Sequence, residues 1–431
     1  MFKRFLKLFF LGITLLFFTG TTYASGITNY YLFVTPDYWT ANNPRGNDLL
    51  LNNQQILEYN RQIEDKVDPV YSMKNYPDGI AVEKLLEFIS SDSVLNDPLY
   101  REGKEVSERY KNVLREQINA KALIAKNIKV RHGVVVRRTN IRGMPTGEGV
   151  FYYPNDTSFD VFQEAVLRPC EPVAILHQSA NGYFYYIQSY NYRGWVSRFD
   201  VAVTDKSTWL KYADPKDFLV VVAPNYNVKF GVQTVYCDMG TKLPIAAVEN
   251  NSSIVFMPSR TMDGRLSETK VRIENNSAVN HGYLPYTVNN ILRQAFKYYS
   301  TPYGWGDLQK GVDCSGFIVS VYRTMGIMLP RNGDQMELTP GSVSSFSGLD
   351  SEQRQNLVNT LKPGTVLFFD GHVMLYVGTS NRVPYIIHSL AAHYTNDKRN
   401  VEKRVLVSDL SLKRANGMTY LDELTTGIFF K

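Results

Sequence analysis

Cysteine is scarce in this chain: three occur among 431 residues, at positions 170, 237 and 314. An odd number means that one disulfide at most can form, so at least one thiol stays free. The count allows a disulfide between Cys170 and Cys237, and it equally allows three free thiols. A framework of several disulfides is excluded.

Long apolar runs are missing after the first line of the sequence. That line, MFKRFLKLFFLGITLLFFTGTTYASG, has three early basic residues, an apolar run from Leu8 to Phe18, and small residues around Ala24. This pattern predicts a cleaved signal peptide over residues 1–24, with an uncleaved amphipathic anchor as the alternative. We therefore expect an exported protein, in the periplasm or cell envelope or secreted. No later stretch reaches the roughly 18 apolar residues of a membrane span, so we expect none after cleavage.

Charge of one sign is also limited. The net charge of +6 suits an anionic polymer such as cell wall, but the sequence lacks the dense basic stripe that nucleic-acid binding needs. The histidine and cysteine spacings fit no zinc pattern. We expect no metal, no cofactor and no nucleic-acid partner, and we expect a monomer.

The composition indicates folded structure throughout, since 44% of the residues are hydrophobic and 13% are aromatic. A mature chain of roughly 400 residues exceeds what one core usually serves. Helix-compatible spacing over 80–92 and 100–126 gives way to short strand-like runs separated by turn residues, and then to mixed helices and strands. The predicted units are a helical N-terminal domain (25–127), two small β-barrels (128–204 and 205–282) and an α+β domain (283–431).

The stretch VDCSGFIVSVYRTMGIM places Cys314 at the beginning of a predicted helix. Asp313 is the expected N-cap, and Gly326 ends the helix. The apolar positions fall on one helical face: Phe317, Ile318, Val321, Tyr322 and Met325. Cys314 lies outside that face, in the first turn, where unpaired N–H groups and the helix dipole favour an anion. We expect a thiolate at neutral pH; a buried structural cysteine is the alternative.

Two histidines follow on a predicted hairpin with strands at 365–369, 372–378 and 385–389. His372 begins the second strand, and His388 lies on the third. Their separation of 16 residues is even, so in the simplest antiparallel registers both side chains point to one face. A cysteine at a helix start with two such histidines fits a nucleophile, a base and a group that orients the base. For His393 we expect a structural role.

Five segments carry a family resemblance: TPYGWGDLQKGVDCSGF, LPRNGDQ, LKPGTVLFF, GHVMLYVG and YIIH. In this order and spacing they resemble the NlpC-type cysteine peptidases, a family of bacterial cell-wall hydrolases. The resemblance covers about residues 284–430 and implies a papain-like α+β fold. By similarity, Cys314 is the nucleophile, His372 the base and His388 the polar third residue. Further residues match family positions that line the substrate cleft: Tyr303, Asp313, Ser315 and Arg331.

Upstream the resemblance continues more weakly. Residues 152–202 are similar to the first of two bacterial SH3 domains that precede this catalytic domain in multi-domain members, and residues 26–126 resemble their clip-like N-terminal domain. The alternative is a pair of plain barrel cores, in which Tyr192 and Trp195 serve packing only.

The resemblance implies an endopeptidase that cuts the amide between γ-D-glutamate and the diamino acid of peptidoglycan stem peptides. The alternatives are an N-acetylmuramoyl-L-alanine amidase, another papain-like acyl transfer, or a catalytically silent wall-binding protein. In this architecture the first SH3 domain closes the cleft where the stem begins, which implies a preference for a free L-Ala amine. A buried ammonium needs a carboxylate partner, and Asp313, Glu148 and Asp160 are the expected choices. The sequence leaves open whether the diamino acid is diaminopimelate or lysine.

Overall fold

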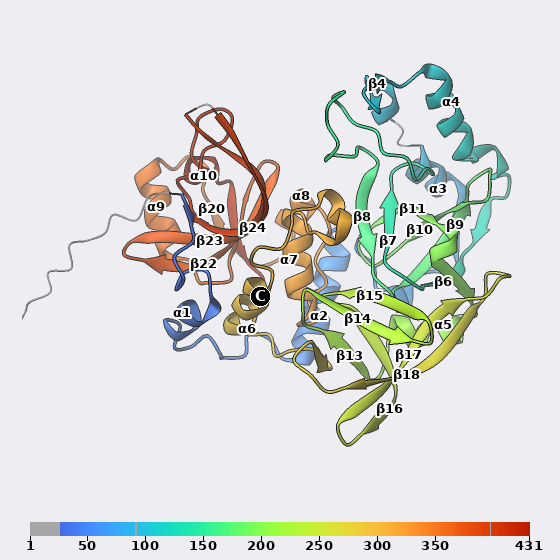
Figure 1. Cartoon of the computed structure of the whole chain (residues 1–431), viewed down its shortest axis with the longest axis horizontal. Helices are drawn as coiled ribbons and strands as arrows, with labels where there is room; N and C mark the ends of the chain where they lie inside the picture. The colour runs from blue at the N-terminus through green and yellow to red at the C-terminus, as the bar shows by residue number, and fades with distance from the viewer. Residues whose placement is uncertain (1–25, 91–92, 397) are drawn as a thin grey trace, which may run out of the picture.

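The computed structural model describes residues 26–90, 93–396 and 398–431, so the expected signal peptide at 1–24 lies outside the described residues. The chain forms several packed units (Figure 1): a C-terminal α+β part lies on one side, and β-rich units with helices α3 and α4 lie on the other. Helices α7 and α8 lie between the two sides. Among the described helices, none combines the length and apolarity needed to cross a bilayer.

The C-terminal part is built on a seven-stranded antiparallel sheet in the order β1-β24-β23-β22-β21-β25-β20. Its strands are β1 (Ile27–Thr28), β20 (Ser342–Ser345), β21 (Val366–Phe369), β22 (His372–Ser380), β23 (Val383–Thr395), β24 (Lys398–Asp409) and β25 (Thr426–Phe429). Its helical segments are α6 (Val288–Lys297), the irregular η5 (Trp305–Lys310), α7 (Cys314–Arg323), α8 (Gly333–Glu337), α9 (Ser351–Thr360) and α10 (Tyr420–Glu423). The three strands predicted at 365–369, 372–378 and 385–389 are confirmed as β21, β22 and β23. Strand β23 is much longer than expected, and it forms an antiparallel hairpin with β24.

Helix α7 packs on strands β22 and β23 through the apolar face that the sequence predicted. All five positions of that face are 0% exposed: Phe317, Ile318, Val321, Tyr322 and Met325. The N-cap prediction is confirmed, because the Asp313 side chain accepts a hydrogen bond of 2.7 Å from the Gly316 N–H. The helix start is thereby fixed against the sheet that carries the two histidines.

The first β-rich unit is a seven-stranded antiparallel sheet in the order β12-β6-β9-β10-β11-β7-β8. Its strands are β6 (Arg131–Val135), β7 (Thr139–Arg142), β8 (Gln163–Leu167), β9 (Pro172–Gln178), β10 (Phe184–Gln188), β11 (Arg193–Ser197) and β12 (Val201–Thr204), with the short helix η4 (Arg198–Asp200) before β12. Strand β8 packs against the η5 segment of the C-terminal part.

The second β-rich unit has a five-stranded sheet in the order β18-β17-β16-β13-β19 and a separate β14-β15 hairpin. Its elements are α5 (Lys206–Ala213), β13 (Phe218–Val221), β14 (Asn225–Phe230), β15 (Gln233–Asp238), β16 (Lys242–Glu249), β17 (Ser252–Arg260), β18 (Leu266–Glu274) and β19 (Val279–His281). Cys170 and Cys237 are both buried and free, so the described structure contains no disulfide between them.

The N-terminal segment divides its apolar side chains between two cores. Trp39 of α1 and Ile63 of α2 belong to the core of the C-terminal part, whereas Leu85 of α3 and Leu114 of α4 belong to the core of the β-rich units. The elements are α1 (Pro36–Ala41), α2 (Asn53–Lys66), η1 (Met73–Asn75), β2 (Gly79–Ala81), α3 (Val82–Ile89), η2 (Ser93–Asn96), β3 (Tyr100–Arg101), β4 (Lys104–Glu105), α4 (Glu108–Gln117), η3 (Ala120–Ala122) and β5 (Asn127–Lys129). The helix expected over 100–126 is shorter, because the β3-β4 hairpin occupies its first turns.

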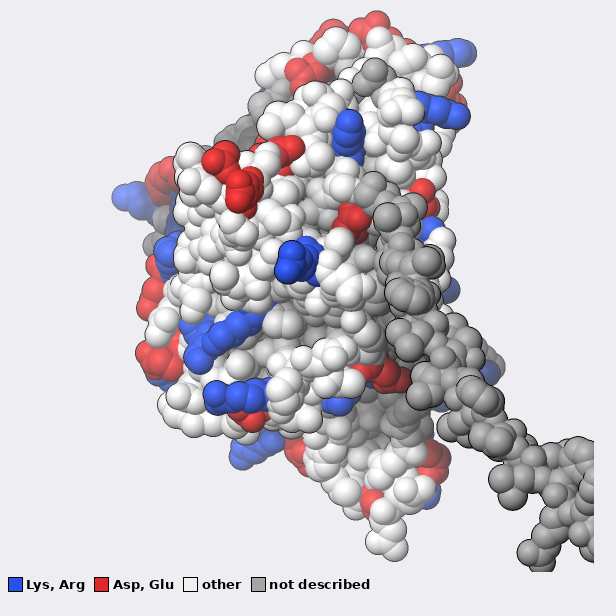
Figure 2. All heavy atoms as spheres, turned by 90° about the vertical axis from the view of Figure 1, so that its left-hand side faces the viewer, with Lys and Arg blue, Asp and Glu red and all other residues white. Residues whose placement is uncertain are grey.

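Acidic and basic side chains are interspersed over the face of the C-terminal part that Figure 2 shows, and uncharged residues cover most of it. That view therefore shows mixed charge over this outer face rather than a field of one sign.

Candidate active site

A cavity of about 780 Å³ lies where the C-terminal part meets the first β-rich unit. It is lined by every site residue that the sequence predicted except His388: Tyr303, Asp313, Cys314, Ser315, Arg331 and His372. The first β-rich unit contributes Phe159, Gln163 and Glu164 to the wall. The cavity is therefore a shared cleft between two units rather than a feature of the C-terminal part alone.

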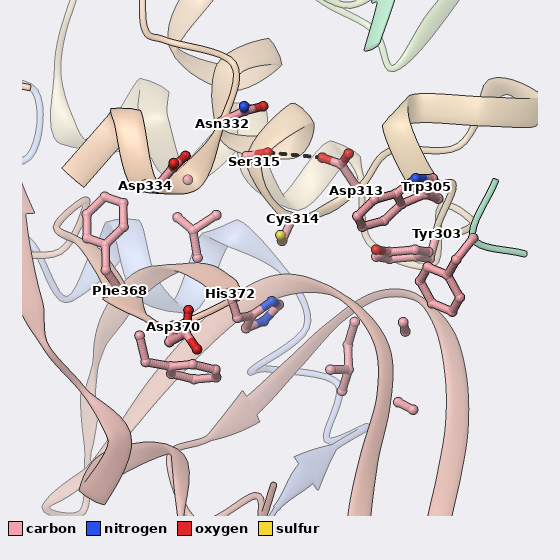
Figure 3. A pocket seen from close by; sticks show the side chains of 18 of the residues that line it. Tyr303, Trp305, Asp313, Cys314, Ser315, Asn332, Asp334, Phe368, Asp370 and His372 are labelled. Carbon is pink, nitrogen blue, oxygen red and sulfur yellow. Dashed lines mark hydrogen bonds between the residues drawn. The ribbon is translucent and has the colours of Figure 1, made fainter. Parts of the chain in front are cut away.

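Cys314 and His372 face each other within this cleft. Figure 3 shows Cys314 at the beginning of α7 and His372 at the beginning of β22, with both side chains directed into the cavity. The two-residue turn Asp370–Gly371 joins β21 to β22 and leaves His372 paired with Phe369 at the end of the hairpin. The beginning of α7 and the beginning of β22 therefore bring the Cys314 thiol and the His372 imidazole to the same cavity.

His388 lies behind His372 and is completely buried. Its Nδ1 is 2.8 Å from Nε2 of His372, and its own Nε2 is 3.1 Å from the Ser408 hydroxyl oxygen. The expectation that the two histidine side chains share one face of the sheet is confirmed. The chain of contacts fixes the orientation of the His372 ring through its far nitrogen.

The shared face depends on a β-bulge that the sequence argument did not include. The two-residue turn Asn381–Arg382 sets a register in which Ser380 pairs with Val383. Continued without interruption, that register would place His388 opposite Leu375, three residues from His372 and therefore on the other face. One extra residue, Val377, lies between the paired positions and shifts the register, so that Leu375 pairs with Ile387 instead.

The pKa values of Cys314 and His372 differ from those expected of a thiolate and its base. Burial, helped by the Asp313 carboxylate, raises the pKa of the Cys314 thiol to about 12, although hydrogen bonding from the Val373 N–H acts in the other direction. Burial and the nearby Arg414 lower the pKa of His372 to about 3. The prediction of a thiolate at neutral pH is therefore wrong for this structure: both groups are neutral, because desolvation outweighs the helix dipole.

This charge state predicts how Cys314 reacts with iodoacetamide. Since only the thiolate reacts, a neutral thiol should be alkylated about tenfold faster for each unit of pH between 6 and 9. The measurement is the rate of mass gain of the intact protein, with Cys314→Ala as the control that takes up no label. A rate that is constant over this range would instead show a preformed thiolate–imidazolium pair.

Asp313 and Arg331 form a buried ion pair beside the cysteine. Arg331 donates to both carboxylate oxygens of Asp313, at 3.0 and 2.6 Å, and to the Ser315 hydroxyl at 2.7 Å. Asp307 completes the cluster, because it accepts the Asp313 N–H at 2.9 Å and lies 3.3 Å from Arg331. Burial raises the pKa of Asp307 to about 6. Gly316 is needed here, since a Cβ on it would lie 2.1 Å from the Asp307 carboxylate.

Glu148 and Asp160, the two barrel carboxylates that were expected to meet the L-Ala amine, do not line the cleft. Asp160 is ion-paired with Arg142, and Glu148 is bound by Tyr110 and Arg101. Both expectations are wrong, because Asp160 is held by Arg142 within the barrel and Glu148 joins the barrel to the N-terminal segment. The Asp313 carboxylate does line the cleft, but it is already occupied by its arginine and by the helix start.

Glu164 is the carboxylate that the sequence argument missed. It lines the cleft, its carboxylate accepts a hydrogen bond of 2.5 Å from the Tyr192 hydroxyl, and burial raises its pKa. No local sequence signal marks it, since it reaches the cleft only because β8 packs against η5. Direct contacts hold that packing: Gln163 donates to the Gly306 carbonyl at 2.8 Å, and Trp305 donates to the Asp160 carbonyl at 3.1 Å.

His393 lies outside this constellation, with its Nε2 3.6 Å from Glu402. Within residues 26–90, 93–396 and 398–431, no three His, Cys, Asp or Glu side chains are grouped in a way that could hold a metal ion.

Comparison with known families gives two matches. Residues 300–405 match the NlpC/P60 family, and residues 150–197 match the SH3 domain of SH3b1 type. The first match contains Cys314, His372 and His388, and the second contains Glu164. The chain is thus multi-domain, with a bacterial SH3 domain and a papain-like NlpC/P60 domain on the two sides of the cleft.

Two curated proteins are similar in sequence. A dipeptidyl-peptidase 6 from Lysinibacillus sphaericus is 24% identical over 244 residues, which cover 52% of this chain and 79% of that protein. A gamma-D-glutamyl-L-lysine dipeptidyl-peptidase from Bacillus subtilis is 29% identical over 148 residues, covering 32% of this chain and 42% of that protein. The structure of an NlpC/P60 endopeptidase from Photobacterium damselae subsp. piscicida superposes with a TM-score of 0.72 at 17% identity, over 89% of this chain and 94% of that one. Because the sequence identity is only 17%, the similarity to the Photobacterium damselae structure concerns the fold alone.

Proposed function

The C-terminal domain belongs to the NlpC/P60 family and is a cysteine peptidase, and from this premise we propose that the chain cuts the γ-D-glutamyl–diamino acid amide of peptidoglycan stem peptides. The observation that carries the proposal is the Cys314–His372 pair in one cleft, with His388 on the far nitrogen of His372. The name of the Bacillus subtilis relative, a gamma-D-glutamyl-L-lysine dipeptidyl-peptidase, supports the choice of bond.

In the proposed mechanism the thiol and the imidazole begin neutral. His372 takes the proton of Cys314 as the sulfur attacks the carbonyl carbon of D-glutamate, and the oxygen of that carbonyl becomes an oxyanion. The backbone N–H of Cys314 stabilises this oxyanion, since the first residue of α7 has no helical acceptor for it. His372 then gives the proton to the departing amine, and later activates the water that hydrolyses the thioester. His388 keeps Nε2 of His372 protonated, which leaves Nδ1 as the basic nitrogen.

The remaining predicted cleft residues bind and position the substrate in this proposal. Arg331 holds the Asp313 carboxylate and the Ser315 hydroxyl in fixed positions beside the nucleophile. Tyr303 is half-buried beside Cys314, and its ring lies 6.3 Å from that of Phe159 on the SH3 side. Together they shape the end of the cleft at which the stem peptide begins.

We assign the preference for a free L-Ala amine to Glu164. The SH3 domain closes this end of the cleft with Phe159, Gln163 and Glu164, so a stem peptide that ends there places its first residue against them. An ammonium group buried at that point needs an anionic partner, and the Glu164 carboxylate accepts a hydrogen bond from Tyr192 while it faces the cleft. An arriving ammonium would also favour the ionised carboxylate, whose pKa burial now raises.

The test compares L-Ala-γ-D-Glu-L-Lys with the same peptide acetylated on the L-Ala amine. The parent should hydrolyse the free peptide about tenfold to a hundredfold faster, the value of a charge-assisted contact. Glu164→Gln should lose most of that ratio through its rate on the free peptide, whereas Glu148→Gln, on the same domain but bound to Tyr110, should keep it. Equal rates of the parent on both peptides would show that the barrel does not select the amine.

The rest of the organisation is proposed with this function. Residues 1–24 are a signal peptide, 25–127 a clip-like domain, 128–204 and 205–282 two SH3-like domains, and 283–431 the peptidase domain. The protein acts as an exported monomer in the periplasm or cell envelope. The proposal of a second SH3-like unit is supported by its strand content: the five-stranded sheet β18-β17-β16-β13-β19 and the separate β14-β15 hairpin.

A further inference from the structure

The catalytic cleft extends past Cys314 on the side away from the SH3 domain. Figure 3 shows Tyr303 and Trp305 on one side of Cys314, which is the side that the SH3 domain closes. Asp334 and Asp370 lie on the other side. Since the stem peptide begins at the closed side in the proposed function, the departing diamino acid occupies the other side, which we call the leaving-group half.

Two of the charged residues that line the leaving-group half are already bound within the protein. Glu337 accepts a hydrogen bond of 2.8 Å from the Thr425 hydroxyl. Arg414 donates to the Glu423 carboxylate at 2.5 Å, and its guanidinium lies 4.9 Å from the centre of the Phe369 ring. Neither side chain can therefore meet a ligand without giving up part of these contacts.

The charged residues that remain in this half are Asp334, Asp370 and Lys413. All three are exposed, and their side chains form no hydrogen bond or ion pair with another described residue. Asp334 lies at the beginning of α8, Asp370 in the turn before β22, and Lys413 in the loop between β24 and α10. The leaving-group half thus offers unpaired charge of both signs to a substrate.

A hydroxyl group without a partner adds a hydrogen-bond donor to this half. Tyr420, the first residue of α10, lines the cleft and is 3% exposed, yet its hydroxyl forms no hydrogen bond within the described part of the chain. Unlike the fully buried hydroxyl of Tyr190, it is not closed off from the cleft. Burial raises the pKa of Tyr420, so the phenol stays protonated and can donate. Such a donor costs free energy until an acceptor reaches it.

Phe369 brings these groups into one region. Asp370 follows it directly in the chain, and the Tyr420 ring packs on it with centroids 4.9 Å apart. The guanidinium of Arg414, the neighbour of Lys413, also lies over the Phe369 ring. A substrate side chain that enters this region therefore has a carboxylate, an ammonium group and a hydroxyl around it.

We propose that the leaving-group half selects a diamino acid whose side chain ends in both an ammonium and a carboxylate group, as in diaminopimelate, over lysine, which ends in an ammonium group alone. Lys413 and the Tyr420 hydroxyl bind the carboxylate, and Asp370 and Asp334 bind the ammonium group. Lysine satisfies only the two aspartates and leaves the donors unused. This inference rests on the proposed function, because it concerns the residue that follows the bond to be cut.

The experiment measures kcat/KM of the full chain on two tetrapeptides, L-Ala-γ-D-Glu-X-D-Ala, in which X is meso-diaminopimelate or L-lysine. Both peptides end in D-Ala, so they differ only in the side-chain carboxylate. We expect a rate about tenfold higher on the diaminopimelate peptide, the value of one charge-assisted hydrogen bond. A third peptide, with that carboxylate amidated, keeps nearly the same size without the charge and should be cleaved at the rate of the lysine peptide.

Three variants test the assignment of residues. Lys413→Met should lower the ratio of the two rates to about one, and Tyr420→Phe should lower it by about threefold, both through the diaminopimelate peptide. Asp370→Asn should slow both peptides and keep the ratio, because both carry the ammonium group. Lys362→Met is the matched control: this lysine is exposed on the same domain outside the cleft, so the ratio should stay as in the parent.

The ratio of rates separates selection from loss of fold, since a misfolded variant would lose activity on both peptides alike. Equal rates of the parent on both peptides, or a faster rate on lysine, would overturn this inference and leave the proposed function in place. A ratio that Lys413→Met retains would overturn it as well. If the parent cleaved neither tetrapeptide, the proposed function would fail and this inference with it.

Discussion

Cys314→Ala should reduce hydrolysis of a γ-linked stem peptide by more than about a thousandfold, because it removes the atom that forms the thioester. The same change should alter the free energy of unfolding by about 1 kcal/mol or less, since Cys314 lies off the buried face of α7 and leaves only a small gap at the cleft wall. The measurements are initial rates on purified peptide and thermal unfolding of both proteins.

Cys237→Ala provides the matched control. Its side chain is 0% exposed in the core of the β-rich units, so the same substitution there should leave turnover intact while it lowers stability through a cavity. If Cys314→Ala kept substantial activity, or if it unfolded far below the parent while Cys237→Ala did not, Cys314 would be a structural residue and the nucleophile would lie elsewhere.

The second large effect separates the two histidines. His372→Ala should lose about a thousandfold in kcat/KM, because it removes the imidazole that faces Cys314 across the cleft and takes the thiol proton in the proposed mechanism. His388→Gln should lose about tenfold to a hundredfold, since its amide oxygen can still accept from Nε2 of His372. The readout is the pH profile of kcat/KM together with kcat and KM on the same peptide.

A purely structural role for His388 would lower stability without changing the pH profile, whereas loss of the correct tautomer of His372 changes kcat and leaves KM nearly constant. If both variants were equally inactive, His388 would transfer a proton itself, and the division of roles between the two residues would need to be revised.

The local features of the site follow from the sequence to a large extent. The cap at Asp313 and the apolar face of α7 depend on contacts within a few residues, so periodicity and capping chemistry were enough to predict them. The hairpin prediction gave the right face for His372 and His388, but it rested on an even spacing alone. The actual cause is the bulge at Val377, which compensates for a two-residue turn.

The features that the sequence did not reveal depend on packing between distant segments. Glu164 reaches the cleft only through the contact of β8 with η5, and nothing in the local pattern distinguishes it from Glu148. The charge state of the Cys314–His372 pair likewise depends on burial, which the helix dipole argument ignores. Contacts between domains and desolvation are both properties of the assembled chain.

The most direct test of the central claim is the mass of the first products that the parent protein releases from a stem tetrapeptide, L-Ala-γ-D-Glu-diamino acid-D-Ala. Cleavage by Cys314 at the D-glutamyl carbonyl predicts two products of fixed mass, the dipeptide L-Ala-D-Glu and the dipeptide of the diamino acid with D-Ala. Release of free L-Ala, release of D-Ala alone, or an intact tetrapeptide after prolonged digestion would contradict it.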